Sequence, residues 1–176
     1  LFCNRKNTVK DDNGSVPGRA LQPRIPGKVV LVGMMGAGKS TLGRHAALRL
    51  GRPFVDVDAV IEEEHGTTIA DMFRRDGEEA FRRRELAAIE RLLASPSAMI
   101  MAAGGGAFCQ DPVRRCLEGR ALTVFLRVEE GELLRRLEQS DAALRPILGG
   151  DGWRERVAGL VASRYPFYEQ ADLVLD

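Results

Sequence analysis

A glycine-rich segment that contains a lysine and a serine carries the strongest chemical signal in the sequence. Residues 33–40 read GMMGAGKS, a complete GxxxxGK[ST] pattern, and a threonine follows. Glycines permit turns that point successive backbone N–H groups at phosphate oxygens, while the lysine and the hydroxyl suit phosphate and Mg²⁺. We therefore expect ATP as co-substrate and Mg²⁺ as cofactor. The expected ATP-binding residues here are Gly36, Ala37, Gly38, Lys39, Ser40 and Thr41, of which Lys39 is also expected to be catalytic and Ser40 to bind the metal.

Two aspartates, Asp56 and Asp58, follow the next apolar run. If both stand at the end of a strand over 53–57, strand alternation aims them at the same side. Ligands of open parallel sheets bind beyond the carboxyl ends of the strands. We expect Asp56 to hold a Mg²⁺-bound water and Asp58 to orient or deprotonate an acceptor hydroxyl. In isolation such a pair more often caps a helix or carries surface charge, but its place beside a phosphate loop favours catalysis.

Candidates for binding the acceptor lie in a basic helix and in a glycine triplet. The segment GEEAFRRRE, residues 77–85, places Arg82 within one turn of Glu85, which can steer the guanidinium. A guanidinium fits a planar carboxylate, so Arg82 is expected to bind one, whereas its two arginine neighbours are expected to face solvent. Gly104, Gly105 and Gly106 follow the third apolar run, where a ligand can approach backbone closely. A plain loop is an equal alternative for these three glycines.

Five short apolar runs alternate with helix-like stretches and must position these residues. This alternation predicts an α/β fold with a parallel sheet and right-handed crossovers. Residues 1–27 lack apolar periodicity and are expected to form a flexible extension before one domain over 28–176. The expected strands are 29–32, 53–57, 98–103, 121–126 and 173–175, and the expected helices are 39–50, 68–75, 77–94, 129–139 and 153–164.

The composition narrows the classes of partner. The 176 residues are 44% hydrophobic and 29% charged with a formal charge of +1, so no nucleic-acid partner is indicated. No apolar run approaches the about 20 residues of a spanning helix, so no membrane partner is expected. The three cysteines have no metal-binding spacing, which fits a reducing compartment. We expect a cytoplasmic monomer that acts on a small molecule.

Six segments together resemble the shikimate kinase family: GMMGAGKST, FVDVDAVIEEEHGTTIADMF, GEEAFRRRE, AAGGGAF, LRPIL and SRYPFYEQAD. The resemblance covers residues 28–176. It implies a three-layer α/β/α fold of the nucleoside-monophosphate-kinase type, with a five-stranded parallel sheet and a short lid. It also implies ATP-dependent phosphorylation of the shikimate 3-hydroxyl.

The resemblance further implies roles for individual residues. Shikimate would contact Asp58, Arg82, Arg164 and the glycine triplet, and Asp56 would be the outer metal residue. Arg145 in LRPIL would be the catalytic lid arginine that closes on the phosphates of ATP, within a mobile segment over 140–152; a surface loop arginine is the alternative. Arg136 would lie beside adenine. Arg164 precedes Tyr165-Pro166, where we expect the proline to end the helix and point that end at the site.

Two other interpretations stay open at this point. Another small-molecule kinase, for gluconate or a nucleoside monophosphate, would share the phosphate loop, and a non-catalytic effector-sensing domain could share the whole fold. The intact Lys39, Asp58 and Arg82 favour a catalyst. The adenine-covering loop and closing helix of the family do not follow Leu175, so we expect adenine to be held weakly by this chain.

Overall fold

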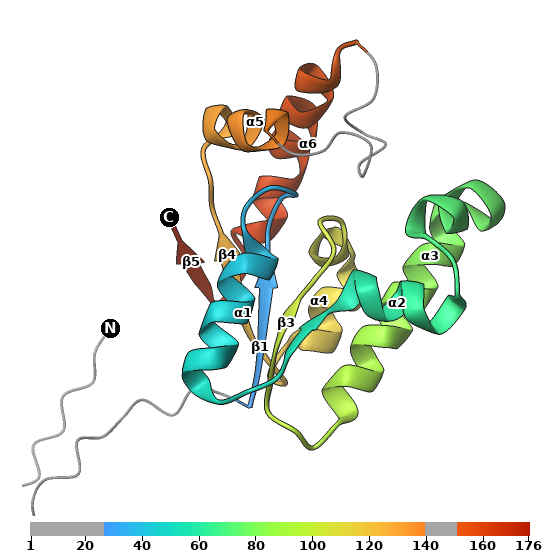
Figure 1. Ribbon diagram of the computed structural model, residues 1–176, viewed down its shortest axis with the longest axis vertical. Helices are drawn as coiled ribbons and strands as arrows, with labels where there is room; N and C mark the ends of the chain where they lie inside the picture. The colour runs from blue at the N-terminus through green and yellow to red at the C-terminus, as the bar shows by residue number, and fades with distance from the viewer. Residues whose placement is uncertain (1–26, 140–150) are drawn as a thin grey trace, which may run out of the picture.

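A five-stranded parallel sheet lies at the centre of the computed structural model, which describes residues 27–139 and 151–176 (Figure 1). Its strand order is β2-β3-β1-β4-β5, and every neighbouring pair is parallel. The carboxyl ends of the strands therefore meet at one edge of the sheet, as the α/β prediction required. The strands are β1 (Lys28–Val32), β2 (Phe54–Asp56), β3 (Met99–Ala102), β4 (Leu122–Leu126) and β5 (Leu173–Leu175).

Helices flank this sheet and pack on one another. The first helix contacts β1, β2 and β3, the third contacts the second and fourth, and the sixth contacts the fifth. Within the described ranges, no helix combines the length and the apolar character needed to cross a membrane. The helices are α1 (Lys39–Leu50), α2 (Val57–His65), α3 (Ile69–Ala94), the 3₁₀ turn η1 (Ala107–Cys109), α4 (Asp111–Leu117), α5 (Glu130–Glu138) and α6 (Trp153–Tyr168).

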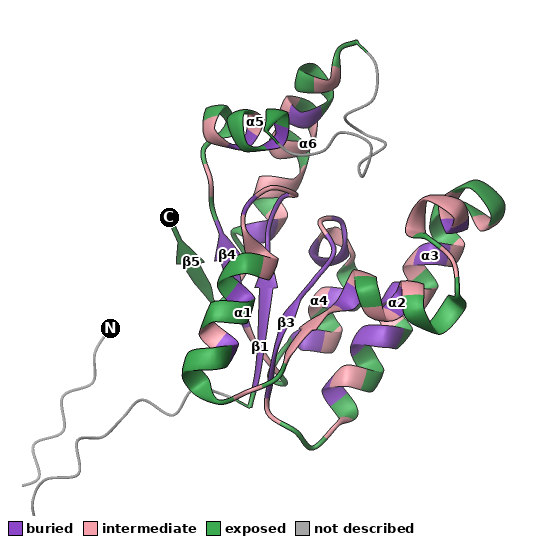
Figure 2. Ribbon diagram, viewed as in Figure 1, coloured by how far each residue is buried: buried purple, intermediate pink, exposed green. Residues whose placement is uncertain are grey.

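The hydrophobic core follows the central strands. All five residues of β1 and all four of β3 are buried, whereas β5 at the sheet edge is exposed (Figure 2). Continuous burial confirms the expectation that the run over 29–32 is covered on both faces. The large side chains of Phe125, Met34 and Tyr168 are also fully buried, so the core reaches the phosphate loop and α6.

The expected helices over 68–75 and 77–94 join into α3, which bends at Gly77. This residue has φ 80° and ψ 170°, a conformation outside the helical range that glycine adopts without strain. The rings of Phe73 and Phe81 pack across the bend with their centroids 4.7 Å apart. The break in the sequence pattern was thus correctly placed, although the two halves remain one packed unit.

Several expectations about the elements were wrong or lie outside the described residues. Pro166 does not end a helix, because α6 continues to Tyr168 with the proline in its last turn. The proline ring removes one hydrogen-bond donor and crowds the preceding turn, yet the helix continues for two residues beyond it. The helices α2 and α4 were not expected. The extension over 1–26, Arg145 and most of the proposed lid fall outside the described ranges.

Candidate active site

The glycine-rich segment forms the turn between β1 and α1. Gly36 and Gly38 have φ of 80° and 92°, left-handed conformations that residues with a side chain rarely adopt. The Lys39 Nζ donates to the carbonyls of Gly33 and Met34 at 2.8 and 2.9 Å, so its ammonium lies over the turn. The turn leads into the N-terminus of α1, where free N–H groups and the helix dipole favour a phosphate.

A hydroxyl and a carboxylate meet beside this turn. The Ser40 Oγ donates to Asp56 Oδ2 at 2.8 Å, which joins the start of α1 to the end of β2. Both are hard oxygen donors of the kind that Mg²⁺ prefers. In residues 27–139 and 151–176 no group of three or more His, Cys, Asp or Glu side chains could hold a metal. The two oxygens therefore fit Mg²⁺ as a partial shell, which phosphate and water usually complete.

Asp58 lies in the first turn of α2, because β2 already ends at Asp56. The strand-alternation argument for its direction was therefore wrong. Burial raises the pKa of Asp58 above its ordinary value, and the Asp56 carboxylate raises it further, while Lys39 and Arg82 oppose the shift. A carboxylate with a raised pKa is the better proton acceptor near neutral pH.

The glycine triplet lies against the charged side chains that the sequence singled out. A Cβ on Gly104 would lie 2.7 Å from Asp58 Oδ1 and 2.7 Å from Glu85 Oε1. A Cβ on Gly106 would lie only 2.4 Å from Arg82 Nη2. Real Cβ atoms do not approach so closely, so the absence of side chains lets these groups gather around one loop. A plain connecting loop would not need glycine at both positions.

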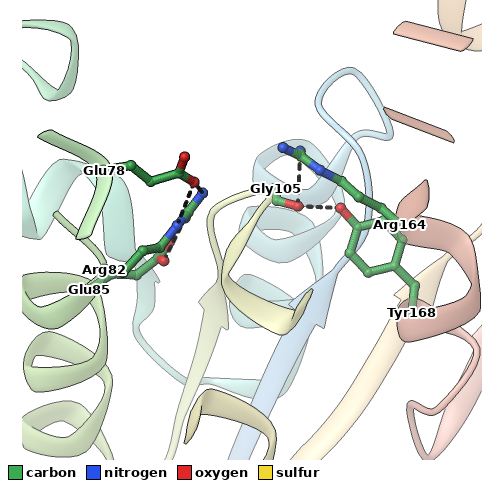
Figure 3. A network of polar contacts seen from close by, with 6 residues as sticks. All are labelled: Glu78, Arg82, Glu85, Gly105, Arg164 and Tyr168. Atoms are coloured by element: carbon green, nitrogen blue, oxygen red, sulfur yellow. Dashed lines mark hydrogen bonds and ion pairs between the residues drawn. The ribbon is translucent and has the colours of Figure 1, made fainter. Parts of the chain in front are cut away.

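The middle glycine is held from the other side by α6 (Figure 3). The Arg164 Nη1 donates to the Gly105 carbonyl at 3.3 Å, and the Tyr168 hydroxyl donates to the same oxygen. Sequence reasoning missed Tyr168. The available signal was its position four residues after Arg164, which places both side chains on one face of a helix.

The Arg82 guanidinium is fixed by two carboxylates and two rings. It bonds to Glu85 Oε2 at 2.8 Å and to Glu78 Oε1 at 2.9 Å. Its carbon lies 5.9 and 5.4 Å from the ring centroids of Phe73 and Phe81. The expected steering by Glu85 is confirmed, whereas Glu78 was missed. Glu85 is 1% exposed and burial raises the pKa of its carboxyl, which Arg82 opposes.

Arg136 reaches the phosphate loop from α5. Its Nη1 lies 4.0 Å from where a Cβ on Gly38 would stand, and its Nε donates to Glu132 Oε1 at 2.6 Å. The structure thus brings Arg136 to the Lys39 side and gathers Asp58, Arg82 and Arg164 around the glycine triplet. The two groups lie on adjacent loops at the carboxyl end of the sheet.

The proteins that are similar to this chain in sequence and in structure include shikimate kinases. A family model described as shikimate kinase matches residues 35–176. The shikimate kinase of Rhodopseudomonas palustris is 43% identical over 147 residues, which cover 84% of this chain and 71% of the relative. That of Symbiobacterium thermophilum is 43% identical over 143 residues, or 81% and 82% of the two chains.

A solved structure agrees with these sequence comparisons. The shikimate kinase from Acinetobacter baumannii in complex with shikimate superposes with a TM-score of 0.80 at 36% identity. The match covers 87% of this chain and 84% of the other. Fold and sequence therefore point to one family.

Proposed function

The chain belongs to the shikimate kinase family, and from this premise we propose how its residues phosphorylate shikimate with ATP. The observation that carries the proposal is the glycine triplet, which lies against Asp58, Arg82 and Arg164 at once. We assign the 3-hydroxyl as the acceptor, giving shikimate 3-phosphate and ADP. The alternatives of another small-molecule kinase and of an effector-sensing domain gain no support from the comparisons.

On the nucleotide side, the turn over 33–40 receives the phosphates. Its N–H groups and Lys39 bind the β- and γ-phosphates, for which Lys39 exchanges the two carbonyls that it now contacts. Ser40 and Asp56 would hold Mg²⁺. Mg²⁺ held there would supply positive charge that offsets the charge developing on the phosphates during transfer. Arg136 assists from α5, and Arg145 is proposed to do so from the segment that follows.

On the acceptor side, two arginines and one aspartate orient shikimate. Arg82 and Arg164 lie on opposite sides of the glycine loop and bind the carboxylate of shikimate, while the loop backbone packs against its ring (Figure 3). Asp58 accepts the hydrogen of the acceptor hydroxyl and takes up the proton as the bond to phosphorus forms. Because the transition state is loose, orienting the hydroxyl matters more than increasing its nucleophilicity.

We further propose that the enzyme acts as a cytoplasmic monomer. Cys109 and Cys116 are free thiols, as expected in a reducing compartment. Light scattering of the purified enzyme would give its mass in solution, and a mass of twice the 19.3 kDa of the chain would contradict the monomer.

An assay of ADP release against shikimate, quinate, gluconate and AMP tests the function, and two variants test the site. We expect turnover with shikimate. Arg82→Lys and Arg164→Lys should raise the KM for shikimate by about tenfold while the KM for ATP stays unchanged, because a point charge cannot replace a bidentate fork.

Arg83→Lys is the matched control, because Arg83 is exposed and its ion pair within the described part of the chain is with the exposed Glu79, one turn away on the same helix. Its constants should equal those of the parent enzyme. Faster ADP release with gluconate or AMP than with shikimate would show that shikimate is not the preferred substrate. A defect in ATP binding would show that the two arginines are assigned to the wrong substrate.

A further inference from the structure

We propose that Tyr168 is a positioning residue for shikimate, acting through the Gly105 carbonyl that its hydroxyl shares with Arg164. This rests on the assignment of the glycine loop and Arg164 to shikimate made above. Tyr168 itself lies in the core and does not line the site, so it acts on the substrate only through these two groups.

The tyrosine hydroxyl lies where the two halves of the site meet. Tyr168 is 0% exposed, and its hydroxyl donates to Gly105 while lying 3.8 Å from Met34 Sδ in the phosphate loop. A buried hydroxyl without a partner is costly, so this hydrogen bond is strongly favoured over an open loop. Burial raises the pKa of Tyr168 far above its ordinary value, so the group remains an O–H donor at neutral pH.

The anchored Gly105 carbonyl also orients the following peptide N–H and the Arg164 side chain. In a planar trans peptide the carbonyl and the next N–H point in opposite directions. A carbonyl directed at α6 therefore turns the Gly106 N–H away from α6, to the other side of the loop. The same oxygen accepts from Arg164 at 3.3 Å, so one anchored atom sets both the loop backbone and the arginine.

Glycine gives the loop the space it needs but also the greatest conformational freedom, so an external anchor is required. The ring of Tyr168 supplies a rigid one. It packs against Phe125 of β4 at 5.2 Å and against Tyr165 at 6.1 Å between centroids. The position of the hydroxyl is thus set by the central sheet and not by the loop itself.

The experiment is Tyr168→Phe, which keeps the ring and removes the hydroxyl. We expect the KM for shikimate to rise about tenfold, as for the loss of one good hydrogen bond, while the KM for ATP changes less than about twofold. Calorimetric titration of shikimate without nucleotide should show the same loss of affinity.

Tyr165→Phe is the matched control. Tyr165 lies on the same helix and in the same ring cluster, and its hydroxyl donates to the carbonyl of Val128, outside the glycine loop. Both variants should lower the melting temperature by similar amounts, but only Tyr168→Phe should weaken the binding of shikimate. An equal shikimate defect in Tyr165→Phe would reduce Tyr168 to a core residue and overturn the proposal.

A double variant with Arg164→Lys distinguishes the positioning role of Tyr168 from the assignment of the shikimate site itself. Because both side chains share one acceptor, the double variant should lose less than the product of the single effects. Strictly multiplicative effects would overturn the shared anchor. If Arg164→Lys weakens shikimate but Tyr168→Phe does not, the positioning role fails while the site stands. If neither does, the assignment of the site fails as well.

Discussion

At the scale of single residues, the acceptor site depends on glycines, whose lack of a side chain leaves space for neighbouring charged groups. The space beside Gly104 is filled by Asp58 and Glu85, and the space beside Gly106 by Arg82. Arg82 cannot move far without losing its ion pairs to Glu85 and Glu78. The loop and its charged neighbours therefore form one packed unit.

Gly106→Ala is expected to weaken shikimate binding while leaving the enzyme folded. The new methyl group would displace the Arg82 guanidinium, whose nearest atom lies 2.4 Å away, and the long side chain can yield by rotating. We expect the KM for shikimate to rise by about tenfold or more, with a loss of stability of about 1–2 kcal/mol. Steady-state kinetics and thermal melting measure both quantities. An unchanged KM in the folded variant would show that Arg82 does not bind shikimate.

At the scale of elements, α6 presents two functional side chains to the glycine loop, and its solvent side remains free to change. Gly159 lies within α6, is exposed, and has nothing within 4 Å of an added Cβ. Gly77 also has open space around it, but it stands at the bend of α3 with φ 80°. The two positions differ in backbone conformation and not in packing.

The same substitution should therefore act in opposite directions at these two positions. Gly159→Ala should stabilise the enzyme by about 0.5–1 kcal/mol, since alanine favours a helix. This corresponds to a rise in melting temperature of about 1–4 °C. Gly77→Ala should lower the melting temperature, because alanine is strained at positive φ. Calorimetric melting tests both, and shifts of the same sign would contradict the explanation.

Local patterns predicted the parts of the fold that depend on neighbouring residues. The bounds of the five strands and of the phosphate loop were expected within a residue or two. Both signals, a continuous apolar run and the GxxxxGK[ST] spacing, lie within short segments of the sequence. The place of Asp58 in a helix was not predicted, since the segment FVDVD does not indicate where strand pairing stops and a helix begins. The same holds for Tyr168, whose partner lies 63 positions away.

Pro166 shows a different limit of sequence reasoning. A proline usually marks the end of a helix, yet the packing of the Tyr165 and Tyr168 rings against Phe125 keeps the last turn of α6 in place. Tertiary contacts thus outweighed a local preference. The roles assigned to Arg136 and the other site residues remain predictions.

At the scale of the whole molecule, ion pairs at the surface connect stability to pH. Hydrogen bonds from Arg135 and Arg136 lower the pKa of Glu132 from 4.5 to about 2. The pKa of Asp76 is likewise lowered, by Arg75 and Arg84. An acid whose pKa is lower in the folded state adds stability above its unfolded pKa, and this stability is lost as pH falls through the folded value.

The free energy of unfolding should therefore fall between about pH 5 and pH 2, and Glu132→Gln should make that fall shallower. Urea unfolding across this range measures it. Added salt should reduce the difference between the two proteins, because the pairs are exposed to solvent. Parallel curves for the parent and the variant would show that the interactions of Glu132 do not stabilise the fold.

The positions of the site residues along the chain also determine when the site can form during synthesis. The phosphate loop leaves the ribosome early, but the hydroxyl of Tyr168 contacts Met34 across 134 positions of the chain. Arg164 and Tyr168 both lie on α6, close to the last strand. Contacts so distant in sequence form late and slow the folding of parallel sheets. A nascent chain can therefore shape its phosphate loop well before it can hold shikimate, and acceptor binding would report that α6 has packed against the two loops.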